Sequence, residues 1–136
     1  MSGKPVYDFL GYKMINFNYE RNNDGDLNSF SIKANKVISN NVYNLFYLIE
    51  LGFDNNDSKT KATFVSTFII NDLEWLEEIS KAKMDVNVFA SVSFPYIRSM
   101  IYSITNDSRK GAEIPVLDLR KYDLGEGIVF HRTDNN

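Results

Sequence analysis

Alternation of apolar and polar residues dominates the first half of the chain. The pattern is clearest over residues 42–53, where one parity consists of Tyr43, Leu45, Tyr47, Ile49, Leu51 and Phe53. Strict alternation over such a length predicts a β-strand. Three further extended segments are expected over residues 7–19, 30–38 and 62–70, separated by turns rich in asparagine, which tolerates left-handed backbone conformations.

The first of these segments changes phase along its length. Tyr12 and Met14 share one parity, whereas Phe17 and Tyr19 share the other. One extra residue in a strand shifts the parity in this way. The sequence therefore predicts a β-bulge around Met14 and Ile15.

The third and fourth segments are apolar on both of their faces. Phe46 and Leu48 lie opposite the parity of Tyr43 to Phe53, and Val65 and Ile69 lie opposite Phe64 and Phe68. An antiparallel sheet usually exposes one polar face to water. We therefore expect helices to cover one face of the sheet, and another subunit or a ligand to cover the other.

The hydrophobic period changes after the fourth segment. Asp72 is suited to cap a short helix, and a longer helical pattern follows Val86, with Ile97, Met100, Ile101 and Ile104 at helical spacing. Pro115 predicts extended backbone over residues 114–119. These elements predict an α+β fold, a four-stranded antiparallel sheet with helices packed on one face. We expect one domain over residues 1–136, with its core in residues 7–119 and a polar tail in residues 120–136.

Composition excludes several kinds of chemistry. The 136 residues include no cysteine and a single histidine, His131, which we expect to be a solvated tail residue. Thiolate catalysis, disulfides and multi-histidine metal centres are therefore excluded, and no constellation typical of an enzyme or a cofactor site is present. A net charge of -3 disfavours nucleic acid as a partner. The sequence shows neither the layout of a signal peptide nor a membrane-spanning stretch, so we expect a cytoplasmic protein.

What remains is more apolar surface than one sheet face and one helix need. Large apolar patches mark partner sites, although each residue alone is also consistent with a place in the core. The candidate residues for an apolar groove are Phe68, Ile70, Leu73, Trp75, Leu76, Phe94, Tyr96, Val116, Leu117 and Leu119.

Two parts of the sequence resemble the SecB family of bacterial protein-export chaperones. The run Ser93-Phe94-Pro95-Tyr96-Ile97-Arg98 resembles the Phe-Pro-Tyr-Ala-Arg element of that family, with Ile97 in place of alanine, and residues 114–119 resemble its Pro-Leu-type extended segment. The resemblance implies a homotetramer, assembled as a dimer of dimers, that binds unfolded polypeptides in apolar grooves without ATP. In this interpretation the ten apolar residues named above form the client-binding groove.

The chain departs from the family beyond residue 120. SecB-like chains commonly continue into a further helix, whereas residues 121–136 are polar and interrupted by glycine. The resemblance implies the translocation motor SecA as a partner in an export role. Because the C-terminal segment differs, we assign no SecA-binding site to residues of this chain. A holdase chaperone is the leading hypothesis. The alternatives are a dedicated protein-interaction module of SecB-like fold, such as an antitoxin-guarding chaperone, and a small-molecule binder or enzyme, which no convergent polar group supports.

Overall fold

Five antiparallel strands form a single sheet in the order β1-β4-β3-β2-β5. The structure, a computed structural model, describes residues 5–21, 28–37, 39–54, 58–105 and 118–132. Adjacent strands in the sequence pair directly for β2–β3 and β3–β4, whereas β1 and β5 occupy the two edges. The strands are β1 (Tyr7–Arg21), β2 (Asn28–Val37), β3 (Asn44–Asp54), β4 (Ser58–Ile70) and β5 (Ile128–Arg132).

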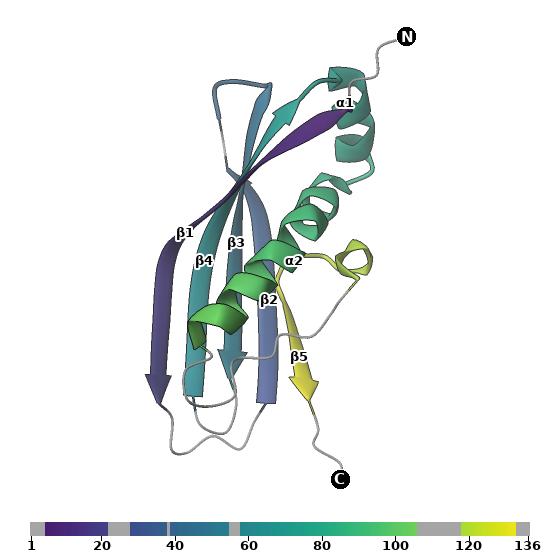
Figure 1. The fold of residues 1–136 in the computed structure, drawn as a ribbon. Coiled ribbons are helices and arrows are strands. Elements are labelled where there is room, and N and C mark those ends of the chain that lie inside the picture. The colour runs from purple at the N-terminus through teal and green to yellow at the C-terminus, as the bar shows by residue number, and fades with distance from the viewer. Residues whose placement is uncertain (1–4, 22–27, 38, 55–57, 106–117, 133–136) are drawn as a thin grey trace.

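Two helices lie on the same side of this sheet. Helix α1 (Leu73–Lys81) follows β4, and helix α2 (Asp85–Thr105) runs diagonally across the sheet face (Figure 1). Asp72 caps α1 as the sequence predicts, because its carboxylate accepts a hydrogen bond from the backbone N–H of Trp75 at 3.1 Å. A short 3₁₀ turn, η1 (Leu119–Lys121), packs beside α2. The predicted α+β architecture, with helices on one face of an antiparallel sheet, is therefore confirmed.

Helix α1 ends in a tight hydrogen-bonded turn. The backbone N–H of Met84 donates to the carbonyl of Ile79 at 2.8 Å, and that of Lys83 donates to Ser80 at 3.0 Å. This is the double hydrogen bond of a Schellman motif, whose left-handed position is usually glycine. Lys83 occupies it with a φ of 58°. The turn reverses the chain and sends α2 back over the sheet.

The core lies between α2 and the inward parity of the strands. Ile32, Ile49, Phe64 and Ile97 are fully buried in one part of it. A second part, nearer α1, is built around Tyr47, Phe68 and Phe89. The alternation that predicts β3 is thus the alternation between this core and the opposite sheet face.

The predicted bulge in β1 is confirmed. The pairing of β1 with β4 shifts register between Met14 and Asn16, which leaves Ile15 as the extra residue. A second shift, between Phe9 and Gly11, is not predicted by the sequence. Gly11 has a φ of 116° there, a conformation that side-chain-bearing residues rarely adopt.

The expectation of four strands is wrong, because the C-terminal segment adds β5 to the free edge of β2. Ile128 pairs with Ile32, and Phe130 pairs with Phe30, whose ring it meets at a centroid distance of 6.3 Å. His131, expected in a solvated tail, lies in this strand opposite Ser29. A segment of five residues after two glycines shows too little alternation to predict a strand, and its partner is distant in sequence. Most of the predicted extended segment 114–119 lies outside the described residues.

Candidate functional site

The Phe-Pro-Tyr element lies in the middle of α2, with Pro95 inside the helix. Proline has no N–H, so the carbonyl of Ser91, one turn earlier, loses its helical donor. The side-chain hydroxyl of Ser91 is also buried without a hydrogen-bond partner. This turn of α2 therefore presents one hydroxyl without a partner, beside a carbonyl that has lost its usual helical donor.

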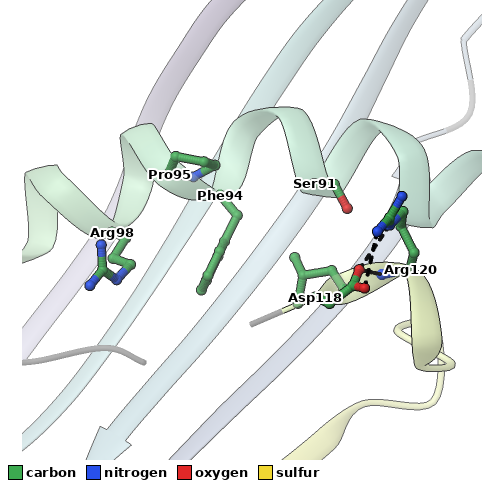
Figure 2. A pocket seen from close by; sticks show the side chains of 7 residues that line it. Ser91, Phe94, Pro95, Arg98, Asp118 and Arg120 are labelled. Atoms are coloured by element: carbon green, nitrogen blue, oxygen red, sulfur yellow. Dashed lines mark hydrogen bonds and ion pairs between the residues drawn. The ribbon is translucent and has the colours of Figure 1, made fainter. Parts of the chain in front are cut away.

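A cavity of about 180 Å³ lies between this turn of α2 and η1 (Figure 2). Among the described residues, its walls come from helix α2 and the η1 segment, and they combine apolar and charged groups. It is lined by Ser91, Phe94, Pro95, Arg98, Asp118, Leu119 and Arg120. An apolar cavity of about 150 Å³ is enough to hold a benzene molecule, so this one is large enough for a single large side chain.

An ion pair closes the η1 side of the cavity. The carboxylate of Asp118 accepts from Arg120 through Nε at 2.9 Å and Nη2 at 3.1 Å, a two-pronged arrangement (Figure 2). It also caps η1 by accepting from the backbone N–H of Arg120. These hydrogen bonds lower the pKa of Asp118 to about 2, so the pair is charged across the physiological pH range. The cavity therefore has an apolar centre and a charged pair on its η1 side.

Asn87 holds η1 against α2. Its side-chain amide donates to the carbonyl oxygens of Leu119 and Tyr122, both at 2.6 Å, and the side chain is buried. Since Leu119 and its neighbours form one wall of the cavity, this amide positions that wall. The sequence does not single out Asn87, because a single polar residue early in a helix can have either a solvent-facing or a buried side chain.

Aromatic side chains fill the junction of β1, α1 and α2. The ring of Tyr7 stacks on that of Trp75 at 5.7 Å and meets the edge of Phe89 at 5.3 Å. Further along α2, the ring of Tyr96 lies 5.5 Å from that of Phe9. Tyr96 is 54% exposed. It is therefore an accessible aromatic surface next to a packed one.

The ten candidate groove residues separate into four groups. Four are buried in the core, two are half-buried and two are exposed: Phe68, Ile70, Phe94 and Leu119; Trp75 and Leu76; and Leu73 and Tyr96. Of the buried four, Phe94 and Leu119 also line the cavity. Val116 and Leu117 lie outside the described residues. A role of these residues in client binding stays a prediction.

Other kinds of site find no support in the described part of the chain. Among those residues no group of three or more His, Asp or Glu side chains is placed to hold a metal ion. None of the helices described is long and apolar enough to cross a membrane.

Comparison with known proteins places the fold. The α+β arrangement, an antiparallel sheet with two helices, is consistent with the SecB-like chaperone class. The structure is similar to the Mycobacterium tuberculosis SecB-like chaperone Rv1957, solved in complex with a ChAD peptide from the antitoxin HigA1 (Rv1956). The TM-score is 0.55 at 10% sequence identity, over 82% of this chain and 88% of the mycobacterial one. No family model matches the sequence, and no curated protein sequence matches it.

Proposed function

We propose that this protein is an ATP-independent holdase chaperone that binds apolar segments of unfolded polypeptides. The observation that carries the proposal is the combination of a SecB-like fold with an apolar cavity between α2 and η1. The fold neighbour, a chaperone, is bound to a peptide. A cavity sized for one side chain, next to an exposed aromatic ring, suits an extended chain that offers apolar residues one at a time.

The mechanism is binding rather than bond chemistry. The Ser91 hydroxyl lines the cavity and has no hydrogen-bond partner, so it is able to accept a hydrogen bond from a backbone N–H of a bound client. A client side chain in the cavity contacts Phe94 and Leu119, and the Asp118–Arg120 pair limits the direction of entry. Binding the unfolded state of a client lowers the concentration of free aggregating chains by mass action.

A second candidate function is a dedicated module that guards one partner. The observation that favours it is the partner of the fold neighbour, a peptide from an antitoxin. Affinity for many unrelated unfolded segments supports the holdase. Affinity for one peptide, with no measurable binding of unrelated unfolded chains, supports the dedicated module. An export role through SecA and the homotetramer are proposals that rest on the sequence resemblance.

A cavity-filling variant tests the proposed site. Ser91→Leu places an isobutyl group in the cavity and removes the unpaired hydroxyl, so it should leave the fold intact and weaken binding of an apolar extended peptide at least about tenfold. Ser99→Leu makes the same chemical change at an exposed position of α2 and serves as the matched control. Isothermal titration with both variants checks the prediction. Equal peptide affinity for Ser91→Leu and wild type contradicts the assignment of the cavity.

A further inference from the structure

Strand β5 has the shortest pairing of the strands in the sheet. Its five residues pair with one end of β2 and form an edge of the sheet, whereas β1 at the other edge has 15 residues (Figure 1). The inward side chains of Ile128 and Phe130 are half-buried, and Val129 between them is 57% exposed. Segments with few buried apolar contacts open at a low free-energy cost. β5 is therefore the strand that separates from the sheet most readily.

A glycine hinge precedes β5, and the chain before this hinge is anchored. Leu119 and Leu124 are buried, and the side-chain amide of Asn87 holds η1 on α2. Gly125 and Gly127 follow, and Gly127 has a φ of 85°, a backbone conformation that glycine adopts without strain. β5 is thus able to leave β2 while the η1 wall of the cavity stays in place.

The contacts of β5 show what the edge of β2 binds. The ring of Phe130 stacks on that of the buried Phe30 at a centroid distance of 6.3 Å, and Ile128 lies opposite the buried Ile32. Ile128 and Phe130 both pack against the core. An extended segment with large apolar side chains at two alternate positions makes the same contacts, and its backbone completes the hydrogen-bond ladder of β2. Unfolded polypeptides carry such segments wherever a native strand has one apolar face.

We propose that the β2 edge occupied by β5 is a second client site, at which an extended client segment replaces β5 by strand addition. The inference rests on the proposed function and adds a backbone-mediated contact to the one in the cavity. β5 is an internal competitor at this site, and its tether gives it a high effective concentration. A client segment must match both inward positions of β5 to displace it. The competition therefore selects strand-like segments over segments that are merely apolar.

A designed disulfide that locks β5 on β2 tests the proposal, because the chain has no cysteine of its own. Ser31 and Val129 lie opposite each other on the sheet face away from the helices. Opposite residues of antiparallel strands have Cα separations that suit a disulfide. Oxidised Ser31→Cys/Val129→Cys holds β5 in place, and reduction releases it. Asn16→Cys/Thr63→Cys links β1 to β4 in the same way and serves as the matched control.

Fluorescence anisotropy with a labelled peptide of residues 126–132 measures binding at this edge. Oxidation of Ser31→Cys/Val129→Cys should weaken binding of the peptide at least about tenfold, whereas oxidation of the control should leave it unchanged. Phe130→Ser in the chain removes the stacked ring from β5 and should strengthen binding at least about threefold. A peptide with serine in place of Ile128 and Phe130 should bind none of these proteins.

Two results overturn the proposal. One is equal peptide affinity of the oxidised and reduced forms of Ser31→Cys/Val129→Cys, and the other is an absence of peptide binding by Phe130→Ser. The outcome is separable from that of the proposed function. Suppression of client aggregation together with equal affinities refutes the β2 site alone. Peptide binding that oxidation blocks, without suppression of aggregation, refutes the holdase and leaves strand addition at β2 standing.

Discussion

Replacing Asn87 tests how the cavity wall is held. In Asn87→Ala, the carbonyl oxygens of Leu119 and Tyr122 lose donors that now lie at 2.6 Å. Each hydrogen bond contributes about 0.5–1.5 kcal/mol, and a buried carbonyl left unpaired adds a desolvation penalty of about 1–3 kcal/mol. Only one of the two bonds is fully buried, so one such penalty applies and the free energy of unfolding should fall by about 2–6 kcal/mol.

Asn87→Asp refines the same prediction. At neutral pH the aspartate has no donor and faces two carbonyl oxygens, so it should destabilise the protein more than alanine does. Protonation at low pH restores one donor and should bring its stability closer to that of Asn87→Ala. Burial next to two acceptor oxygens disfavours the ionised carboxylate of Asn87→Asp, so protonation should raise the stability of this variant.

Two measurements check this prediction. Urea unfolding followed by the fluorescence of Trp75, the only tryptophan, gives the free energy of unfolding. Exchange of the Ala34 amide, which donates to the carbonyl of Leu124 at 2.9 Å, reports whether the segment after η1 stays docked on β2. A change below about 0.5 kcal/mol together with unchanged exchange of the Ala34 amide would refute the role given to Asn87.

Three further predictions concern stability. Lys83→Gly should stabilise the protein by about 0.5–1 kcal/mol in urea unfolding, because glycine adopts the left-handed turn freely. Glu77→Gly, at an exposed position in the middle of α1, should instead destabilise it by about 1 kcal/mol. A loss of stability in Lys83→Gly would contradict the Schellman assignment. Tyr47→Phe should cost about 1.5–3 kcal/mol, since the buried hydroxyl donates to the Asp85 carboxylate at 3.2 Å. Burial and the nearby Asp85 raise the pKa of Tyr47, so the contribution of the neutral phenol to protein stability is complete below pH 10 and falls as the pH rises above 10. Urea unfolding midpoints measured from pH 8 to 11 should therefore fall more steeply for the wild type than for Tyr47→Phe. Parallel curves for the two proteins would refute this prediction. Phe68→Ala should cost about 3–5 kcal/mol in urea unfolding, and a cost below about 1 kcal/mol would contradict its place in the core.

The sequence predicts those parts of the fold that depend on local periodicity. The alternation from Leu45 to Leu51 is the burial alternation of β3, whereas Tyr43 precedes the strand and is exposed. The parity change after Met14 is a real register shift. The Asp72 cap is also local, since its acceptor and donor are three residues apart. Each of these depends on neighbouring residues, which is why the pattern alone indicates them.

The remaining features depend on contacts between distant residues. β5 pairs with β2 about a hundred residues away, and its five residues carry only two inward apolar side chains, Ile128 and Phe130. Asn87 contacts carbonyl groups more than thirty residues later. The candidate groove list mixes core and surface residues for the same reason, because apolar character does not indicate whether Phe68 or Tyr96 is the accessible ring.

Light scattering from an aggregating client tests the central proposal most directly. A chemically unfolded protein, unrelated to any bacterial antitoxin, is diluted into buffer with an equimolar amount of this chain and without ATP. A holdase of this kind should suppress the rise in scattering, and Ser91→Leu should suppress it less than Ser99→Leu. Scattering that rises at the same rate with and without the protein, across several unrelated clients, would contradict the account.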